Sequence, residues 1–364
     1  DDARIRASLP TIRELLARGA RVVVLASHLG RPKGKPDPAL SLRPVADRLA
    51  ELLGRPVRFA EDCVGEAAER ALAEAPPGSV ILLENLRFHP EEERNDEGFA
   101  RALARLADVY VNDAFGAAHR AHASTEAVTR FVPDAVAGLL MEQELEFLGR
   151  ALERPERPFV AILGGAKVSD KLEVVRNLVG RVDALLIGGA MAYTFLRARG
   201  VDVGRSLVEP ELEPEARRIE EAARGRAVAF ELPLDHVVAD RLEPDAAIET
   251  LAVGDPAIDG RLGADIGPRT IGRYRDRIRS ARTVVWNGPM GVFEIDAFAR
   301  GTLEIARAVA SVDGTTIVGG GDSIAAVRKA GVADRITHIS TGGGASLEFL
   351  GGRRLPGVEA LADR

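Results

Sequence analysis

Three consecutive glycines followed by an aspartate and a serine, residues 319–323, form the segment of this sequence best suited to chemistry. A β-branched run precedes them and apolar residues at helical spacing follow, which predicts a strand, a tight turn and a helix. Glycines let backbone N–H groups approach a ligand, and a helix N-terminus favours negative charge. The Asp322 carboxylate would repel a phosphate unless a cation lay between them. The segment therefore indicates a binding site for a nucleotide together with Mg²⁺. The alternative is a turn whose glycines serve close packing alone.

Glycines also follow the other apolar runs of the second half, in segments 164–165, 188–189 and 288–291. Lys167 and Lys171 come after the first of these, four residues apart, which predicts that both lie on one face of a helix start and point toward phosphates. A solvated helix face is the alternative. Neither a Walker A loop nor a G-x-G-x-x-G fingerprint occurs, which argues against a dinucleotide-dependent dehydrogenase.

Arginine and histidine follow three apolar runs in the first half. The pairs are His28 with Arg31, Arg87 with His89, and His119 with Arg120. Because the guanidinium fork suits carboxylate and phosphate, we expect these loops to converge on an anion. The alternative is that some of the arginines form surface ion pairs. A zinc site needs three or four ligands and only Asp113 lies near His119 and His122 in the sequence, so we expect these histidines to hydrogen-bond to an anion or to backbone.

Short apolar runs alternate with amphipathic helical patterns through both halves, which predicts an α/β fold with parallel sheets covered on both faces. Ligands of such sheets bind beyond the carboxyl ends of the strands. A charged, proline-broken segment after a helix predicted over 135–152 marks a domain boundary, and 240–270 is expected to be poor in strands. We predict two doubly wound parallel-sheet (Rossmann-like) domains joined by a long helix and hinge. They are residues 1–152, with the tail 350–364 packed back on them, and residues 153–349.

The two predicted domains differ in the chemistry of their loops. The first has arginine and histidine at the strand ends and the second has glycine, so we expect one domain for a small anionic molecule and one for a nucleotide, with chemistry in the cleft between them. A net charge of −6 gives no support for nucleic-acid or membrane partners. The chain has no run of 18 apolar residues that would predict a membrane span. Its one cysteine, Cys63, fits a reducing, cytoplasmic compartment and is expected to be an inert structural thiol.

Eight segments occur in an order that resembles the phosphoglycerate kinase family, from the start of the chain to its end. They are residues 27–34, 84–89, 112–116, 119–122, 164–171, 286–294, 319–323 and 340–346. The resemblance implies a monomeric two-domain enzyme of glycolysis that closes by a hinge. Such an enzyme transfers a phosphoryl group reversibly from 1,3-bisphosphoglycerate to ADP, giving 3-phosphoglycerate and ATP, with Mg²⁺. Its partners would be these small molecules alone.

The same resemblance implies a role for each matching residue. The catalytic residues are Arg4, which orients the reacting carboxylate, Lys167, which stabilises the moving phosphoryl group, and Gly342 and Gly343, which offer N–H groups to it. The phosphoglycerate ligands are Arg4, His28, Leu29, Gly30, Arg31, Arg87 and Arg120. The nucleotide ligands are Gly165, Lys167, Lys171, Gly189, Asn287, Pro289, Gly291, Val292, Glu294, Gly319, Gly320, Gly321, Asp322 and Ser323, with Glu294 on the ribose and Asp322 on the metal.

One part of the family pattern has no counterpart here. Members begin with a further strand whose end carries an Asp and an Asn that contact phosphoglycerate, and no segment of this chain matches it. Because the full arginine set is present, we expect an omitted segment. A natural truncation would instead favour a protein that binds nucleotide without catalysis.

Overall fold

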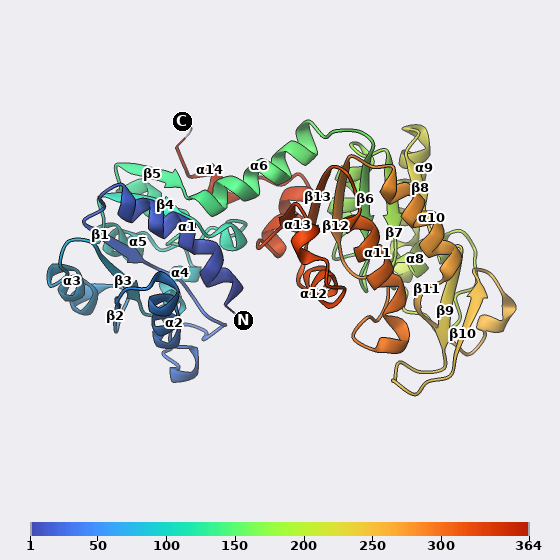
Figure 1. The fold of residues 1–364 in the computed structure, drawn as a ribbon, viewed down its shortest axis with the longest axis horizontal. Helices are drawn as coiled ribbons and strands as arrows, with labels where there is room; N and C mark the ends of the chain where they lie inside the picture. Colours follow the sequence, from blue (N-terminus) through green and yellow to red (C-terminus); the bar gives the residue numbers. More distant parts are fainter. Residues whose placement is uncertain (1, 363–364) are drawn as a thin grey trace. The chain divides into compact units, whose positions relative to one another are not determined.

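The structure is a computed structural model that describes residues 2–362. It divides into two compact units. The first runs up to Glu144 and takes in the chain from Arg354 onward, and the second is Leu145–Arg353 (Figure 1). The division falls inside helix α6 (Leu139–Glu153), eight residues before the predicted boundary at 152. No helix among the described residues combines the length and apolar content that a bilayer span requires.

The first unit contains two small sheets of parallel strands. Strands β1 (Val22–Leu25), β3 (Ser79–Leu83) and β2 (Val57–Ala60) pair in that order, and β4 (Val109–Asn112) pairs with β5 (Asp134–Ala137). The helices are α1 (Ala3–Ala17), α2 (Arg43–Leu53), α3 (Gly65–Ala73), α4 (Pro90–Glu93), α5 (Glu97–Ala104) and α14 (Pro356–Glu359). Val80 of β3 packs with residues of α1 and α2, whereas its neighbour Ile81 packs with residues of α3 and α5. Successive strand residues point to opposite faces, so the sheet is covered on both sides.

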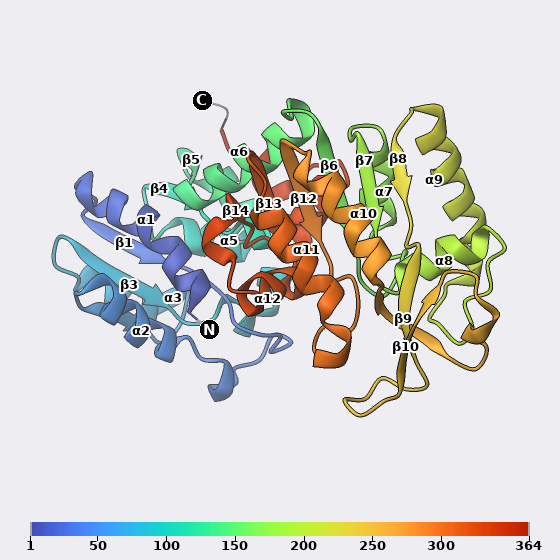
Figure 2. The ribbon, with the colours of Figure 1, turned by 45° about the vertical axis from the view of Figure 1, so that its right-hand side comes forward.

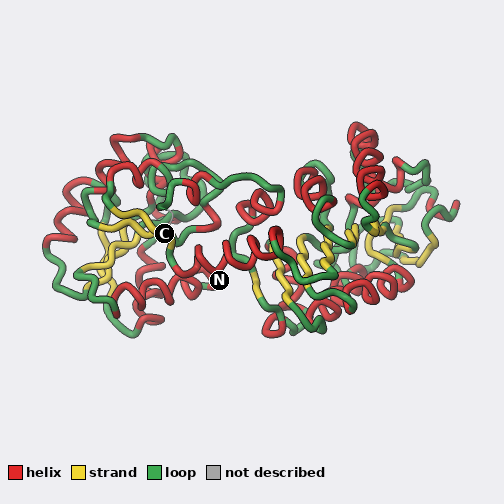
Figure 3. The backbone as a smooth tube through the Cα atoms, turned by 90° about the horizontal axis from the view of Figure 1, so that it is seen from above, coloured by secondary structure: helices red, strands yellow, loops and turns green. Residues whose placement is uncertain are grey.

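A six-stranded parallel sheet forms the centre of the second unit. Its order is β14 (His338–Ile339), β13 (Thr315–Gly319), β12 (Thr283–Asn287), β6 (Phe159–Leu163), β7 (Ala184–Ile187) and β8 (Ala229–Glu231). Its helices are α7 (Leu172–Val179), α8 (Met191–Ala198), α9 (Glu213–Gly225), α10 (Pro268–Arg279), α11 (Arg300–Ala310), α12 (Gly321–Lys329) and α13 (Gly344–Leu350). Helices lie on both sides of the strands (Figure 3), and β6 and β12 are buried throughout. The predicted α/β fold with parallel sheets is confirmed.

The helix predicted over 135–152 begins later than expected. Residues 134–137 form β5, which pairs in parallel with β4, and α6 starts at Leu139. The Asp113 carboxylate holds the start of the helix, because its Oδ1 accepts hydrogen bonds from the N–H groups of Leu140 (2.9 Å) and Met141 (3.1 Å). A three-residue apolar run fits a strand or a helix equally well, and pairing with β4 decided the outcome.

The stretch 240–270 contains strands, so the expectation of a strand-poor segment was wrong. Strands β10 (Ile248–Ala252) and β11 (Leu262–Ile266) pair antiparallel with β9 (Asp235–Ala239), and Figure 2 shows β9 and β10 side by side. Four of the five β10 residues are exposed, so this strand lacks the apolar run by which the others were recognised.

The end of the chain packs within the first unit. The Gly357 N–H donates to the Ala118 carbonyl oxygen (2.9 Å), and Asn112 Nδ2 donates to the Gly357 carbonyl oxygen (3.1 Å). The Ala362 N–H donates to the Ala135 carbonyl oxygen (3.0 Å). These bonds attach the tail to the segments around β4 and β5.

Candidate functional site

Positively charged side chains gather in the first unit around His28, which follows β1. Burial, followed by nearby charges, lowers the pKa of His28 to about 4, so the imidazole is neutral at pH 7. The charges that act on it are those of Arg87, His122, Arg4 and Arg120. These groups come from the start of α1 and from loops after β3 and β4, so the structure brings the predicted arginines together. We call Arg4, His28, Arg31, Arg87 and Arg120 the basic cluster.

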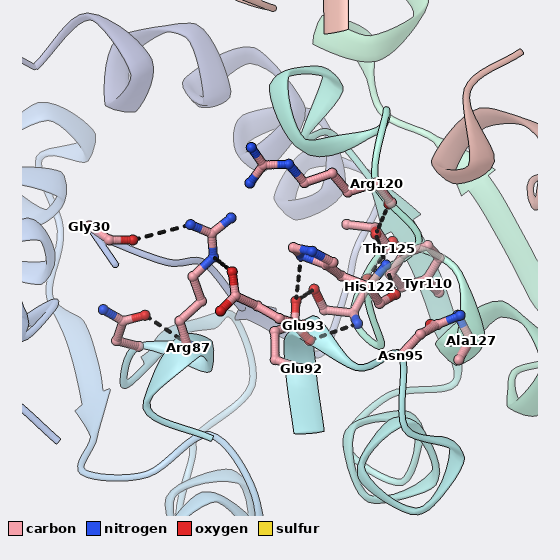
Figure 4. A network of polar contacts seen from close by, with 12 residues as sticks. Gly30, Arg87, Glu92, Glu93, Asn95, Tyr110, Arg120, His122, Thr125 and Ala127 are labelled. Carbon is pink, nitrogen blue, oxygen red and sulfur yellow. Dashed lines mark hydrogen bonds and ion pairs between the residues drawn. The ribbon is translucent and has the colours of Figure 1, made fainter. Parts of the chain in front are cut away.

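Arg87 is the most buried arginine of the basic cluster, with 5% of its surface exposed. Its Nη1 donates to the Gly30 carbonyl oxygen (3.1 Å), while its Nε lies 3.7 Å from Glu93 Oε1 and has no hydrogen-bond partner (Figure 4). Burial lowers the pKa of Arg87 from its usual value, which Glu93 opposes and the charges of Arg120 and Arg31 reinforce. A buried guanidinium with an unused donor is costly unless an anion completes its contacts.

Asn85 joins two segments of the chain. One is the loop that contains Leu29 and Gly30, and the other is the segment that contains Arg87, which we call the Arg87 segment. Its Nδ2 donates to the carbonyl oxygens of Leu29 (2.8 Å) and Leu40 (2.9 Å), and its Oδ1 accepts from the Arg87 N–H (3.0 Å). Gly30 has φ +66°, and a Cβ there would lie 2.7 Å from Leu40 Cδ2. The predicted ligands Leu29 and Gly30 therefore lie beside Arg87 and have a role in shaping its loop.

In the second unit, the glycine-bearing loops lie at one edge of the six-stranded sheet. The register pairs Asn287, the last residue of β12, with Leu163 of β6 and Gly319 of β13. The loops are also bonded to one another. The N–H groups of Gly164, Gly165 and Gly189 donate to the carbonyl oxygens of Asn287, Pro289 and Met290, each at 3.0 Å. Parallel pairing thus brings the predicted nucleotide residues of four strands together.

The two lysines of the first glycine loop do not share a helix face, so that prediction was wrong. Helix α7 begins at Leu172, and the residues before it form turns. Lys171 is 8% exposed, and its Nζ donates to the carbonyl oxygens of Gly164 and Asn287 (2.9 Å for the latter). Burial lowers its pKa to about 8, against the opposing charges of Asp322 and Asp170. Lys167 is exposed. Lys171 therefore joins two strand ends, and Lys167 is the more accessible of the pair.

Two of the predicted nucleotide glycines, Gly189 and Gly291, are required by packing, as is their neighbour Gly164. A Cβ on Gly164 would lie 2.0 Å from the Pro289 carbonyl oxygen, and one on Gly189 would lie 2.5 Å from the Gly165 nitrogen. A Cβ on Gly291 would lie 2.5 Å from the Ala264 carbonyl oxygen. Backbone atoms cannot yield as a flexible side chain can, so the packing alternative accounts for these positions.

Other glycines border open space. An added Cβ would meet nothing within 4 Å at Gly321 or at Gly343, and only ordinary contacts at Gly319. Gly321 is the first residue of α12, directly before the exposed Asp322. Phosphate groups could approach the backbone here, and the helix N-terminus would favour their charge. At Gly320, φ is +89° and a Cβ would lie 3.0 Å from Asn287 Nδ2.

Four further residues were predicted to bind nucleotide, namely Asn287, Val292, Glu294 and Ser323. Asn287 is 3% exposed and its Nδ2 has no hydrogen-bond partner, whereas Ser323 Oγ accepts from the Gly288 N–H (2.6 Å) and links two loops. Val292 donates its N–H to the Ala264 carbonyl oxygen (2.9 Å), and Glu294 is exposed. The Gly342 N–H is already bonded to Ser340 Oγ (3.2 Å), which leaves Gly343 as the less constrained of the predicted catalytic glycines.

A buried arginine among other positive charges, and glycine-bearing loops at the edge of a parallel sheet, are typical of an α/β enzyme that acts on phosphorylated substrates. The model of the phosphoglycerate kinase family matches residues 1–353. The phosphoglycerate kinase of Moorella thermoacetica is 61% identical over all of this chain and 92% of its own length. That of Pelotomaculum thermopropionicum is 58% identical with the same coverage.

Solved structures agree with these relatives. The phosphoglycerate kinase of Coxiella burnetii superposes with a TM-score of 0.90 at 42% identity, over 99% of this chain and 90% of its own. That of Pyrococcus horikoshii gives 0.84 at 38% identity, over 99% of this chain and 91% of its own. The chain belongs to the phosphoglycerate kinase family. It is a phosphotransferase with a carboxyl group as acceptor, which exchanges a phosphoryl group between 1,3-bisphosphoglycerate and ADP in glycolysis.

The sequence did not predict one grouping of residues in the first unit. Asp62, Cys63 and His89 bring possible metal-ligating atoms within 4.8 Å of one another, although 26 residues separate Cys63 from His89 and no spacing pattern connects them. Asp62 Oδ1 lies 2.7 Å from His89 Nε2, so a direct hydrogen bond accounts for this pair. Burial raises the pKa of the Cys63 thiol, which keeps it protonated. Glu92 and Glu93 were also missed, because a run of acidic residues is typical of a solvated surface.

The two kinds of glycine should respond differently to alanine. We expect Gly164→Ala to lower the free energy of unfolding by several kcal/mol, because its Cβ would overlap a backbone oxygen. Gly321→Ala should leave the free energy of unfolding within about 0.5 kcal/mol of the parent and weaken ADP binding. Urea unfolding and calorimetric titration with ADP measure the two effects. Equal losses of stability in both variants would contradict the distinction.

The neutral His28 should make the stability of the protein depend on pH. The pKa in the native state, about 4, lies below the ordinary 6.5, so the unfolded chain gains a proton in this window while the native chain does not. The free energy of unfolding should therefore fall as the pH drops from 6.5 to about 4, and His28→Asn should remove roughly 1–2 kcal/mol of that fall. Urea unfolding across the window tests this. Above pH 6.5 the two proteins should differ by a constant amount, and parallel curves below it would refute the assignment.

Proposed function

We propose that the basic cluster binds phosphoglycerate and that the loops at the edge of the six-stranded sheet bind ADP or ATP. The observation that carries the first assignment is Arg87. Its guanidinium is buried among other positive charges, and its Nε lacks a hydrogen-bond partner. A phosphate or carboxylate would supply the acceptor and offset the repulsion. His28, Leu29, Gly30, Arg31 and Arg120 would complete the site, and Arg4 would orient the reacting carboxylate.

The nucleotide assignment rests on the start of α12. Gly319, Gly320 and Gly321 would present backbone N–H groups to phosphate, and the Asn287 Nδ2 would gain an acceptor. One exposed carboxylate together with nucleotide phosphates is a ligand set that Mg²⁺ favours, so Asp322 fits as its protein ligand. Bound there, Mg²⁺ would neutralise phosphate charge. Lys171 would stabilise the shape of the loops and would also supply positive charge to the site. Glu294 would contact the ribose.

The chemistry needs positioning and positive charge. In the direction of ATP use, a carboxylate oxygen of 3-phosphoglycerate forms a bond to the γ-phosphorus, and the bond from that phosphorus to the β–γ bridging oxygen breaks, leaving ADP. The attacking oxygen carries no proton, so no general base is required. Lys167 and the N–H groups of Gly342 and Gly343 would stabilise the charge on the moving group.

Transfer also requires the two substrates to meet while water is excluded. The basic cluster and the nucleotide loops belong to different units, so we propose closure about a hinge that brings the bound substrates together. We assign phosphoglycerate binding to residues 1–152 with the tail 350–364, and nucleotide binding to residues 153–349. We further propose a monomeric cytoplasmic enzyme without nucleic-acid or membrane partners, which the net charge of −6 and the single cysteine support.

Lys167→Ala tests whether Lys167 stabilises the phosphoryl group during its transfer. We expect ADP binding to stay within a few fold of the parent while kcat falls about 10²–10³-fold, because charge stabilisation would be lost only in the transition state. The readout is 3-phosphoglycerate-dependent formation of ADP from Mg-ATP. Lys329→Ala is the control, because Lys329 belongs to the same unit and pairs with Asp296 at 2.7 Å. Unchanged turnover in Lys167→Ala would rule out its role.

Asp322→Asn tests the metal assignment. An amide is a weaker ligand for a hard cation than a carboxylate, so the Mg²⁺ concentration for half-maximal activity should rise at least about tenfold. The same assay with Mg²⁺ varied at fixed ATP provides the measurement. Asp334→Asn, at an exposed acidic residue of the same unit, should leave the Mg²⁺ dependence unchanged. A parental Mg²⁺ dependence in Asp322→Asn would show that another group binds the metal.

A further inference from the structure

Glu92 is a buried carboxylate beside the basic cluster that the proposed chemistry does not use. It lies in α4 and is 3% exposed. Burial raises its pKa, and the hydrogen bonds from Ser124 and the charge of Arg87 oppose that shift. Because burying a carboxylate costs free energy, its contacts show what it stabilises.

Both oxygens of the carboxylate and the carbonyl oxygen of Glu92 bind one loop. Glu92 Oε2 accepts a hydrogen bond from the Ser124 N–H (3.0 Å) and Oε1 accepts one from Ser124 Oγ (2.5 Å). Its carbonyl oxygen accepts a third from the Ala123 N–H (2.9 Å). Glu92 Oε1 also lies 4.0 Å from His122 Nδ1, which is beyond hydrogen-bonding distance. Three bonds from one residue therefore hold two consecutive residues of the loop. Figure 4 shows Glu92 beside His122 and Thr125 of the same loop.

The loop transmits this restraint to Arg120 and His122 because it is bonded internally. Thr125 Oγ1 donates to the Arg120 carbonyl oxygen (3.2 Å), and the Thr125 N–H donates to the His122 carbonyl oxygen (3.0 Å). The Tyr110 hydroxyl, from β4, donates to the Ser124 carbonyl oxygen (2.7 Å). A shift of Ser124 would therefore move His122 and the charged Arg120.

Glu92 is also bound closely to the Arg87 segment. Arg87 lies in the short helix η2 (Leu86–Phe88), and α4 starts two residues later, at Pro90. The Glu92 N–H donates to the His89 carbonyl oxygen (3.2 Å). Glu92 thus connects two loops that follow different strands, one with Arg87 and the other with Arg120.

We propose that Glu92 is a positioning residue for phosphoglycerate, which holds the loop 120–125 against the Arg87 segment so that Arg120 and Arg87 reach the same anion. This inference rests on the proposed function of the basic cluster. A carboxylate is needed because it accepts charge-assisted hydrogen bonds at both oxygens. A glutamine accepts at one oxygen only, and its amide nitrogen can bond Ser124 Oγ only as a donor.

The position and the charge of Glu92 act on substrate binding in opposite directions. Its negative charge repels an anion, so electrostatics alone predicts that Glu92→Gln would tighten phosphoglycerate binding. Positioning predicts the reverse, because the charge-assisted bonds to Ser124 would become weaker neutral bonds and the loop would shift. The sign of the change in KM therefore separates the two effects.

The test uses the whole chain and the steady-state assay with 3-phosphoglycerate and Mg-ATP. Glu92→Gln should raise the KM for 3-phosphoglycerate about tenfold, with the KM for Mg-ATP unchanged. Ser124→Ala keeps the charge and removes the hydroxyl, and should raise the same KM by a smaller factor. The double variant should show less than the product of the two factors, because both substitutions remove the same bond. Glu91→Gln, at the half-buried neighbouring residue, is the matched control and should match the parent.

Each contrary result has a distinct meaning. A lower or unchanged KM for 3-phosphoglycerate in Glu92→Gln overturns the inference, as does an equal loss in both KM values and kcat, which would show a general structural role. If Glu92→Gln fails to fold, Ser124→Ala decides by the same criteria. An Arg87→Lys variant tests the underlying assignment separately, since an unchanged KM for 3-phosphoglycerate there would refute the basic cluster as the substrate site whatever Glu92 does.

Discussion

The parallel direction of the strands is the constraint on which both sites depend. Parallel strands end at the same edge of a sheet, so loops that are far apart in the sequence become neighbours. In the second unit, the pairing of Asn287 with Leu163 and Gly319 brings three loops together before any side chain makes a contact. In the first unit, pairing of β1 with β3 brings the loop after Leu25 close to the loop after Leu83, where His28 and Arg87 lie. The chemistry of each site is thus the chemistry of residues that follow strands.

Holding these loops together leaves little room for side chains. The glycines of the second unit combine two functions that look alike in a sequence, since Gly164 and Gly189 allow backbones to touch while Gly321 and Gly343 border open space. Lys171 strengthens the close packing by donating to the carbonyl oxygens of two loops. A cation used in this way is held by backbone, so it contributes to the shape of the site as well as to its charge.

Much of the fold could be predicted because many of its strands are continuous apolar runs. The runs that became β3, β6 and β12 are buried on both faces and were recognisable without a partner. Strand β10 is exposed and polar, and the apolar residues of β5 fit the start of a helix equally well, so both depend on pairing that the local sequence does not record. Helical spacing was wrongly assumed for Lys167 and Lys171, because periodicity gives no sign of the turns before α7.

The candidate site was predictable where residue type determines the chemistry. Arginines after three strands indicated an anion, and the structure brings Arg4, Arg87 and Arg120 near His28. The carboxylates beside them were not foreseen, since an acidic run resembles solvated surface. Only the fold shows that Glu92 is buried and bonded to Ser124, whereas Glu93 is more exposed and lies near Arg87.

The two units use positive charge differently, and this difference follows from the groups they contain. Around Arg87, burial and neighbouring charges lower the pKa of both His28 and His122, so the histidines contribute shape and hydrogen bonds while the arginines carry the charge. A guanidinium does not lose its proton in a protein, so an anion bound there would meet a constant charge across the neutral range. Lys171, with a pKa of about 8, can lose its proton near neutrality, and Asp322 opposes that loss. Carboxylate charge at Asp322 therefore helps to keep Lys171 protonated, which strengthens the bonds that join the loops of the proposed nucleotide site.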